Sequence, residues 1–583
     1  MTSFFETTDA PANTSTPYTI AVGDDFFGTL STGTSDWIAI TLTAGTTYSF
    51  GLVGIGAADI GTTDPLVRLR DSSGLTLARN DDGGPGLSSS LTFTVTTSGT
   101  YYVEAHSLVS GPDGGYGLTV TAGDRPSYGV EMGAAELYRP GSSWSPHAPG
   151  TAATVTWGVR DTGPALDASG NAAPFFVLSD AQIAAGQLAL GNFAGVCNLT
   201  FTQVNPGGTS HDATILLGAY NSTTDGAGAF ANYPGSTASG NVAGDLWINN
   251  DAVSTTNLPI GSYDQFVFLH ELGHAMGLAH PGDYNAAPGV SITYANNAQF
   301  AEDSQQYSVM SYFAATATNA MAPGTYPDTL MLYDIYALQQ LYGVNAGFNA
   351  GNTTYGFNAT VGGAYDFTIN TDPLLCIWDG SGVDTLDFSG FSNRQLIDLT
   401  AGHFSNVGGF AGNLSIAVGA AIENAVGGTG RDEIDGNSLR NHLSGGAGAD
   451  TIAGLGGRDV IAGGAAVDIL AGGRGADRLN GGAGSDGLDG NAGNDVLTGG
   501  GGADLFNFTL GTGSDRITDF NAAVDFIGLD PAMWGGAAMT AAEVIASFAV
   551  SRDGHIVLDF GSDEIALLGV TTTTGLESQL LIG

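Results

Sequence analysis

Residues 270 to 280 read His-Glu-Leu-Gly-His-Ala-Met-Gly-Leu-Ala-His, and this stretch predicts a helix that ends in a sharp turn. His270 and His274 are four residues apart, so on a helix they project from one face, one turn above the other. Gly277 can take a left-handed backbone conformation without a Cβ penalty, which lets the chain leave the helix abruptly. That turn would bring His280 back towards the other two histidines. The spacing therefore predicts a zinc site with three nitrogen ligands and an open fourth position.

Glu271 lies beside the first of these histidines, where its carboxylate can act on the attacking water without ligating the metal. The whole chain has nine histidines, and three of them fall in this one stretch. The alternative interpretation, surface histidines on an ordinary helix, is therefore strongly disfavoured. The pattern indicates the chemistry of a zinc hydrolase.

The residues around the motif predict a mixed α/β domain. Ser262 and Gln265 have the spacing of a capping box, so the helix should begin near Tyr263 and stop at Gly277. A second helix and three strands are predicted upstream by their hydrophobic periodicity. The helix covers Ser179 to Phe193, and the strands cover Thr154–Val159, Leu199–Val204 and Ala213–Leu217.

A nine-residue repeat runs in unbroken register from Gly427 to Asn507. Each unit opens with glycine, carries aspartate at its sixth place in eight of nine units, and is apolar at the eighth. A flexible Gly-rich linker keeps no such phase, so that alternative is disfavoured. Aspartates and turn carbonyls supply the hard oxygen ligands that Ca²⁺ prefers. The candidate calcium ligands in the repeat are Asp432, Asp450, Asp459, Asp468, Asp477, Asp486, Asp495 and Asp504.

The repeat resembles the calcium-binding parallel β-roll of repeats-in-toxin (RTX) proteins. Two half-turns of nine residues make one coil, so units 18 residues apart stack, and nine units can hold at most about seven ions. Two units depart from the pattern. Asn441 replaces an aspartate, and Ala466 stands where a glycine is expected. We expect these units to contribute vacant or loose calcium sites.

The amino-acid composition of the chain disfavours some classes of binding partner. The chain has 583 residues, enough for about three or four domains. It carries 57 acidic and 14 basic residues, all of them arginine, and its net charge of −43 argues against nucleic acid or anionic membranes as partners. It has no run of about 18 apolar residues, so no membrane span is expected. Cys197 and Cys376 could form one disulfide or remain two free thiols.

Residues 1–122 alternate polar and apolar residues in short runs, which predicts an all-β sandwich. This segment resembles the bacterial pre-peptidase C-terminal (PPC) domain. The resemblance rests on Asp64 before a strand, Asn80-Asp81-Asp82 after one, and the Gly-Thr-Tyr-Tyr-Val stretch from Gly99. Asp81 and Asp82 could bind calcium, but solvated turn residues are the favoured interpretation. A linker is expected over residues 123–127.

Residues 128–583 resemble the serralysin-type metalloproteases, which are metzincins secreted by Gram-negative bacteria. After the zinc motif come Pro281-Gly282-Asp283-Tyr284-Asn285-Ala286, as in that family, and Tyr307-Ser308-Val309-Met310-Ser311-Tyr312 matches its Met-turn. The resemblance implies that Met310 forms the floor under the zinc. It also implies that Tyr312 is a zinc ligand in the resting enzyme and swings away to hydrogen-bond the oxyanion. Without the zinc motif, a Met-x-Tyr sequence would more often be core packing.

The resemblance extends to two other groups of residues. Ala229, Phe230 and Ala231 correspond to the family's edge strand, which can pair with an extended peptide substrate. Asp379, Asp384 and Asp387 are candidate calcium ligands by position, although they could equally be turn residues.

The resemblance also implies how the protein is exported. A type I secretion ABC transporter would read an uncleaved signal in the C-terminal tail, Leu576 to Gly583, which fits an N-terminus without a secretory signal. Calcium outside the cell would then fold the roll. Protein or peptide substrates and a small periplasmic protease inhibitor are the other implied partners, and we expect a monomer.

We therefore expect a secreted zinc endopeptidase of several domains. An all-β sandwich (1–122) and the linker precede a metzincin α/β zinc protease domain (128–345). A transition region (346–426), the parallel β-roll (427–507) and a β-sandwich-like cap with the secretion signal (508–583) follow. The N-terminal domain could be removed, cover the cleft, or bind substrate or a surface. The alternative function is a calcium-dependent RTX adhesin or surface-layer protein with an inactive protease-like domain, against which the intact site residues argue.

Overall fold

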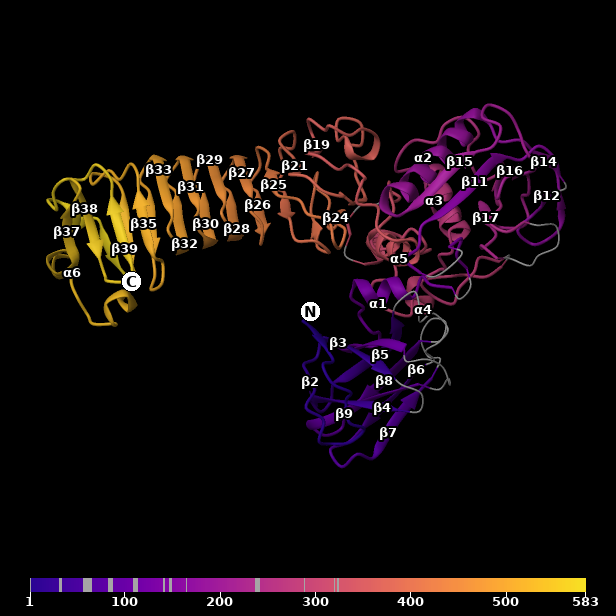
Figure 1. The fold of residues 1–583 in the computed structure, drawn as a ribbon, viewed down its shortest axis with the longest axis horizontal. Helices are drawn as coiled ribbons and strands as arrows, with labels where there is room; N and C mark the ends of the chain where they lie inside the picture. The colour runs from indigo at the N-terminus through magenta and orange to yellow at the C-terminus, as the bar shows by residue number, and fades with distance from the viewer. Residues whose placement is uncertain are drawn as a thin grey trace. The chain divides into compact units, whose positions relative to one another are not determined.

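The computed structural model describes residues 2–583 except 31–33, 56–64, 82–87, 108–113, 140–141, 146–148, 164, 236–241, 288, 319 and 322–323. The chain forms two compact units (Figure 1). The first contains Met1–Phe348 and Leu374–Trp378, and the second contains Asn349–Pro373 and Asp379–Gly583. Among the described residues, no helix combines the length and apolar character that crossing a bilayer requires.

The N-terminal part of the first unit is the expected β sandwich, built from two five-stranded sheets. Alternating residues of both sheets, among them Phe26, Ile38 and Leu118, fill the core between them. Asp81 is exposed after the last residue of β7, while Asp64 and Asp82 lie outside the described residues. One sheet contains β1 (Ser3–Phe5), β3 (Asp25–Leu30), β10 (Gly114–Ala122), β5 (Thr47–Ile55) and β8 (Ser89–Thr94); the other contains β2 (Thr19–Ile20), β4 (Ser35–Leu42), β9 (Gly99–Ser107), β6 (Pro65–Arg70) and β7 (Thr76–Asn80).

The rest of the first unit is an α/β domain around one main sheet. Its strands follow the order β15 (Leu199–Gln203), β11 (Ala153–Val159), β16 (Ile215–Tyr220), β18 (Leu246–Asn249) and β17 (Ala229–Ala231). All neighbours are parallel except β17, which is antiparallel to β18 at the end of the sheet. The remaining strands are β14 (Phe175–Phe176) beside β16, the pair β12 (Ala165–Leu166) and β13 (Ala172–Ala173), and β20 (Leu375–Ile377).

Two helices, α2 (Asp180–Val196) and α3 (Tyr263–Ala275), pack against each other, and α3 lies beside β17 and β18. Ser262 caps α3 as predicted by accepting from the Gln265 backbone N–H at 3.2 Å. The Gln265 side-chain amide donates instead to the Ala185 carbonyl of α2, because helix packing brings that acceptor within reach. The other helical segments are α1 (Val130–Ala135), α4 (Tyr294–Asn297), η1 (Ala315–Ala317) and α5 (Leu332–Tyr342).

The second unit is a two-layered roll of mostly parallel strands, visible in Figure 1 as successive strands stacked side by side, and one sheet ends in antiparallel strands within residues 549–567. The 11-stranded sheet is β19 (Thr354–Gly356), β21 (Thr385–Asp387), β25 (Asn424–Val426), β27 (His442–Ala447), β29 (Val460–Ala465), β31 (Arg478–Ala483), β33 (Val496–Gly501), β35 (Ser514–Ile517), β39 (Glu564–Leu567), β38 (His555–Asp559) and β37 (Ala549–Arg552). The 8-stranded sheet is β22 (Leu396–Asp398), β26 (Glu433–Asn437), β28 (Thr451–Gly457), β30 (Ile469–Gly475), β32 (Gly487–Gly493), β34 (Leu505–Phe508), β36 (Phe526–Leu529) and β40 (Leu580–Ile582). The unit also contains β23 (Phe404–Ser405), β24 (Leu414–Ile416), η2 (Gly363–Tyr365), η3 (Pro531–Trp534), α6 (Ala541–Phe548) and η4 (Leu576–Ser578).

The register of the roll repeats every 18 residues, with Ile434 opposite Ile452 and Leu443 opposite Ile461. The eighth residues of the units form its buried core, as their apolar character predicted. The coil is longer than the repeat, because strands of 346–426 and of 508–583 continue the same two sheets. Those flanking turns lack the nine-residue pattern, so the repeat alone could not reveal them.

Candidate functional site

The three histidines of the motif converge on one point. Their ligand nitrogens lie within 4.8 Å of one another. Nε2 of His280 is 3.1 Å from Nε2 of His274 and 3.3 Å from Nε2 of His270. Zinc–nitrogen bonds of about 2.1 Å at tetrahedral angles separate two nitrogens by roughly 3.4 Å. The cage therefore fits a zinc ion.

A backbone carbonyl orients each imidazole ring. Nδ1 of His270 is 2.8 Å from the Val309 carbonyl oxygen, and the other two rings make the same kind of contact with Leu278 and Tyr284 at 2.8 and 2.9 Å. A carbonyl can only accept, so Nδ1 carries the proton and the Nε2 lone pair faces the cage. These contacts therefore select the tautomer that a metal needs.

Burial keeps the rings neutral. It lowers the pKa of His270 to about 4 and that of His280 to about 3, because the charged forms lose their hydration. The pKa of His274 is lowered further below its usual range by burial and then by the neighbouring rings. Neutral imidazoles bind a divalent cation without first losing a proton at neutral pH.

The turn after the helix depends on Gly277, whose φ is +100°. The Gly277 N–H donates to the His274 carbonyl, and the Leu278 N–H returns to Gly273. A Cβ at Gly277 would overlap the Ser142 carbonyl oxygen, so both the conformation and the space require glycine. This turn carries His280 back to the cage, as the sequence predicted.

Glu271 is buried on α3 beside the cage, and its Oε2 has no hydrogen-bond partner. Burial raises the pKa of Glu271 to about 8, while a hydrogen bond from the Ala231 backbone N–H opposes the rise. A divalent cation in the cage opposes it further, because a nearby positive charge favours the ionised carboxylate. One carboxylate oxygen is thus held by the edge strand while the other is free to take a proton.

Met310 is fully buried under α3 at Gly273. A Cβ at Gly273 would overlap Met310 Sδ, so the helix and the Met-turn touch where that residue has no side chain. The motif treats this position as variable, and its packing role was missed in the sequence. The geometry places Met310 below the helix that bears two of the histidines.

Two buried aspartates that no sequence motif marked hold the loops around the cage. Asp334 of α5 accepts from Ser308 Oγ at 2.7 Å and from the Val309 N–H at 2.8 Å. Asp303 accepts from the Ser311 and Tyr284 hydroxyls at 2.7 and 2.8 Å. No local pattern marks these aspartates, because their partners come from other loops.

The Tyr312 ring lies over the histidines, with its centroid 4.4 Å from that of His280 and 5.7 Å from that of His270. Burial, followed by the charge of Glu271, raises the pKa of Tyr312 to about 12. Its hydroxyl therefore keeps its proton at neutral pH and can donate a hydrogen bond. Tyr233 closes another side, with its ring 5.2 Å from His274 and under the guanidinium of Arg139 at 4.1 Å.

Ala229, Phe230 and Ala231 form β17, the terminal strand of the main sheet of the α/β domain. β18 occupies one edge of β17, and the other edge is paired with no strand among the described residues. β17 also packs against α3, which carries Glu271. An extended chain added along the free edge would therefore run beside the metal cage.

The repeat aspartates share one arrangement in the roll. Oδ1 of every one after Asp432 accepts the backbone N–H of the sixth residue one coil earlier, as from Asp450 to Asp468 at 2.8 Å, whereas Oδ1 of Asp432 accepts from the Gln395 N–H. In six units, a Cβ on the first glycine would contact both Oδ2 of the aspartate and a glycine carbonyl of the next coil, as at Gly445 and Gly463. These cradles of facing oxygens fit a hard cation. Oδ2 is buried without a hydrogen-bond partner in Asp450, Asp459, Asp468, Asp477, Asp486 and Asp495.

Oδ2 of Asp432 at the start of the repeat accepts from the Gly428 N–H, while Asp504 at its end bonds through Oδ1 to the Asp486 N–H. Beyond the repeat, Asp515 and Asp525 continue the same ladder by accepting from Asp495 and Asp504. The nine-residue pattern does not reveal these two residues, because the intervals lengthen from 18 to 20 and 21 residues.

Asp379 and Asp387 each close a turn by accepting from the backbone N–H two residues ahead. Asp379 also accepts from the Tyr355 hydroxyl, and Asp387 also accepts from the Asn358 amide. Asp384 accepts from the Thr353 N–H and keeps a buried oxygen without a partner. Both cysteines are buried and neither belongs to a disulfide in the part of the chain that the structure describes, which favours two thiols over the one bridge that the sequence left open.

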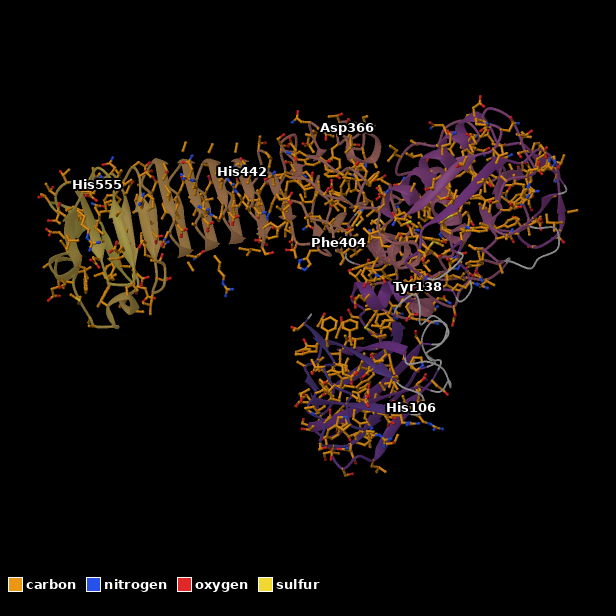
Figure 2. All side chains as sticks on the ribbon, viewed as in Figure 1. His106, Tyr138, Asp366, Phe404, His442 and His555 are labelled. Carbon is orange, nitrogen blue, oxygen red and sulfur yellow. The ribbon has the colours of Figure 1, made fainter. Side chains whose placement is uncertain are left out.

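Figure 2 labels three histidines that do not belong to the cage, His106, His442 and His555. His106 belongs to the N-terminal sandwich, while His442 and His555 belong to the roll and its C-terminal extension. Among the described residues, the cage is the one place where three histidines gather.

Two family models match the chain. Residues 344–564 match the serralysin C-terminal domain of peptidase family M10, and residues 34–107 match the bacterial pre-peptidase C-terminal domain. Serralysin B of Dickeya chrysanthemi is 39% identical over 54% of this chain and 66% of its own length. Metallopeptidase AprA of Pseudomonas marginalis is 38% identical over 58% and 71%. Serralysin C of Dickeya chrysanthemi is 39% identical over 61% and 72%.

An α/β domain that orients three neutral histidines around one point, next to a buried glutamate with a free oxygen, has the construction of a zinc metalloprotease. The similarity to named metallopeptidases over more than half the chain agrees with that class. The chain belongs to the serralysin family, and it also contains an N-terminal PPC domain. It spans roughly two thirds of the length of the relatives it matches.

Proposed function

We propose that the protein is a secreted zinc endopeptidase of the metzincin type, whose catalytic residues lie on α3 and the Met-turn. The observation that carries the proposal is the convergence of three oriented Nε2 atoms beside the free Oε2 of Glu271. His270, His274 and His280 would hold the zinc. When bound, zinc polarises the scissile carbonyl and lowers the pKa of water at the site towards about 7.

Glu271 would act as the general base and then as the general acid. Its free oxygen takes a proton from the attacking water and delivers it to the amine of the leaving peptide. The Ala231 N–H holds the other oxygen, so the carboxylate stays aimed during both transfers. Such a positioned group contributes roughly 10²- to 10⁴-fold in rate.

Tyr312 would stabilise the oxyanion that forms when water adds to the carbonyl. Its protonated hydroxyl can donate to that oxygen, and one such donor is worth roughly 10²- to 10³-fold in kcat. The family resemblance also implies that Tyr312 ligates zinc before substrate enters. The free edge of β17 would bind the substrate in an extended conformation, so main-chain hydrogen bonds would dominate recognition.

The roll would bind calcium through its repeat aspartates and glycine carbonyls. Without cations, closely spaced carboxylates repel one another and keep the roll unfolded during export. Calcium outside the cell would then fold it. We infer export by a type I ABC transporter and inhibition by a small periplasmic protein from the family resemblance.

The first experiment compares wild type with Glu271→Gln on casein, with zinc and calcium supplied. The variant should lose at least about 10²-fold in kcat/KM, because glutamine cannot accept the proton. Zinc content must stay at one ion per chain, which separates loss of catalysis from loss of metal. Equal clearance of casein by both proteins would refute the assignment and revive the adhesin alternative, which the named peptidase relatives do not favour.

Calcium removal tests whether folding of the roll depends on calcium. A calcium chelator should convert the far-ultraviolet circular dichroism of the roll from β structure to disordered chain, and added calcium should restore it. A spectrum that does not change under calcium-selective chelation would contradict a calcium-dependent roll.

A further inference from the structure

Four arginines in the part of the chain that the structure describes lie over aromatic rings. The face of an aromatic ring attracts a guanidinium group, whose N–H donors point outward in its own plane and can bind a second partner. The second partner is what distinguishes the four arginines. The pairs are Arg70 with Trp37, Arg125 with Tyr294, Arg139 with Tyr233 and Arg160 with Trp247.

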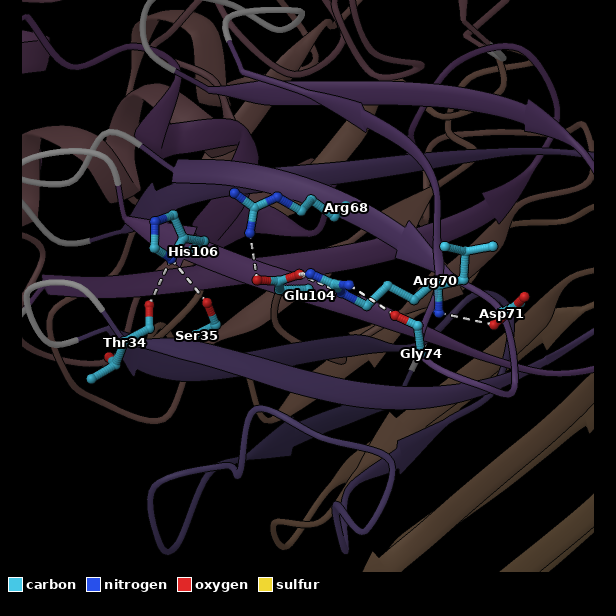
Figure 3. A network of polar contacts seen from close by, with 9 residues as sticks. Thr34, Ser35, Arg68, Arg70, Asp71, Gly74, Glu104 and His106 are labelled. Atoms are coloured by element: carbon cyan, nitrogen blue, oxygen red, sulfur yellow. Dashed lines mark hydrogen bonds and ion pairs between the residues drawn. The ribbon is translucent and has the colours of Figure 1, made fainter.

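Two of these arginines bind a buried carboxylate. In the N-terminal sandwich, Arg70 pairs with Glu104, which Arg68 also holds (Figure 3). In the α/β domain, Arg160 pairs with Asp245. Both acids are buried. This chain therefore builds a carboxylate receptor twice from an arginine that lies on an aromatic ring.

Arg139 makes the same kind of stack but has no acid of its own. Its guanidinium lies 4.1 Å from the centroid of the Tyr233 ring, and its side chain is exposed. Among the residues that the structure describes, no carboxylate forms a salt bridge with Arg139. Arg125, the fourth of the stacked arginines, donates to the Ala295 carbonyl. Arg139 therefore has donors left for a carboxylate from outside the chain.

Tyr233 connects this arginine to the histidine cage. One neighbour of its ring is the guanidinium, and another is the ring of His274, whose centroid is 5.2 Å away in a T-shaped contact. A single aromatic side chain therefore separates the charge of Arg139 from one of the three histidines. A substrate group that lies over the cage on the side of His274 comes close to the guanidinium.

The path proposed for the substrate passes this point. Tyr233 follows the last residue of β17, Ala231, by two positions. The N–H of Ala231 holds Glu271, the proposed general base. A peptide paired with the free edge of β17 therefore runs past Tyr233 where it passes Glu271. Arg139 thus faces the substrate residues next to the bond that is cleaved.

We propose that Arg139 binds an acidic side chain of the substrate close to the scissile bond, so that the protease prefers aspartate or glutamate there. The inference rests on the proposed peptidase function. The planar fork of a guanidinium matches a carboxylate and can pair with it through two N–H···O bonds. Because an endopeptidase substrate continues past the cleaved bond, a side chain and not the C-terminus supplies the carboxylate. The net charge of −43 repels acidic peptides at long range, so such a preference requires a local cation.

The test uses pairs of peptides that differ only in glutamate against glutamine at one position. Both ends are blocked, the position is moved across the residues on either side of the cleaved bond, and mass spectrometry identifies that bond. The enzyme is the full-length protein supplied with zinc and calcium. At one position next to the bond, wild type should show a kcat/KM about 10-fold higher for glutamate than for glutamine. Arg139→Gln should cleave both members of that pair at equal rates.

The ratio of the two rates separates recognition from a structural role. If Arg139 only supported Tyr233, its loss would slow both peptides equally and leave the ratio unchanged. Arg139→Lys keeps the charge but not the planar fork, so it should retain part of the preference. The matched control is Arg79→Gln, which removes an exposed arginine from β7 of the sandwich and should keep the wild-type ratio.

Equal cleavage of every pair by wild type would overturn the proposal while the peptidase function stands. The same preference in wild type and Arg139→Gln would also overturn it. If wild type cleaves no peptide, the peptidase function on which the proposal rests is refuted. A further arm uses glutamine peptides with a free C-terminus. A preference that appears only in this arm would assign Arg139 to the terminal carboxylate and overturn the side-chain assignment.

Discussion

Gly273 is a variable position of the zinc motif, yet it decides how closely the floor of the site approaches the helix. Met310 Sδ fills the space that a Cβ at Gly273 would need. The Met-turn in turn supplies the Val309 carbonyl that orients His270. A side chain here would push the turn away and so disturb a ligand ring, although Gly273 never meets the metal.

Replacing Gly273 with alanine should destabilise the catalytic domain by roughly 1 to 3 kcal/mol, the usual range for overpacking a filled core. Zinc affinity should fall as well, because the His270 ring loses its fixed orientation. Thermal unfolding and competition with a zinc chelator measure the two effects. Gly191→Ala is the matched control: it lies in α2 with nothing near a new Cβ and should gain about 0.5 to 1 kcal/mol. Unchanged stability of Gly273→Ala would show that Met310 moves aside freely.

At the scale of single turns, one unit of the roll is held together by amides. Asn441 donates to the Glu423 carbonyl at 2.8 Å, and Asn437 donates to the Ile422 carbonyl at 2.9 Å. In the regular units, an aspartate whose Oδ2 lacks a hydrogen-bond partner stands at the place of Asn441. A glycine stands at the place of Asn437. Neutral amides that satisfy backbone carbonyls do not need a cation, so this turn should form before calcium binds.

Asn441→Asp should raise the calcium concentration that the roll needs to fold. The aspartate cannot donate to the Glu423 carbonyl, and leaving that half-buried group unpaired costs about 1 kcal/mol. Calcium titration followed by circular dichroism gives the folding midpoint. Asn480→Asp makes the same charge change at an exposed position of the roll and should leave the midpoint near wild type. A midpoint that shifts equally in both variants would attribute the effect to charge alone.

At the scale of the whole first unit, the PPC domain is anchored to the catalytic domain through its linker. Glu302 accepts from the Ser127 hydroxyl and the Tyr128 N–H, and the Tyr128 ring stacks on Phe300 at 4.8 Å. Arg125 adds a hydrogen bond to the Ala295 carbonyl. We therefore expect the two domains to behave as one body in the uncleaved chain.

This anchor should make the stability of the unit depend on pH. Burial raises the pKa of Glu302 from 4.5 to about 7, so the folded state keeps a proton that the unfolded state releases. The stabilisation is complete below about pH 4.5 and is lost as the pH rises to about 7, by roughly 1 to 3 kcal/mol. Glu302→Gln cannot titrate and should show a smaller fall in melting temperature between pH 5 and pH 7.5. Equal falls in both proteins would mean that Glu302 is ionised throughout.

Most of the features that the sequence predicts come from short-range patterns. The residues from His270 to His280 specify a helix, a glycine turn and a three-histidine cage because all these features lie within a few turns of chain. The nine-residue period specifies the roll because every unit repeats the same local geometry. Both architectures follow from contacts between near neighbours or identical units, which a sequence displays directly.

The tertiary structure decided the features that depend on distant partners. Val309 reaches His270 across 39 residues, and Asp334 reaches Ser308 across 26. Arg139 meets Tyr233 only because the chain after α1 folds against the chain after β17. Such pairs obey no period, since their spacing is set by loop lengths and packing. The sequence therefore determined which chemistry the protein carries, and the fold determined how each group is oriented, buried and charged.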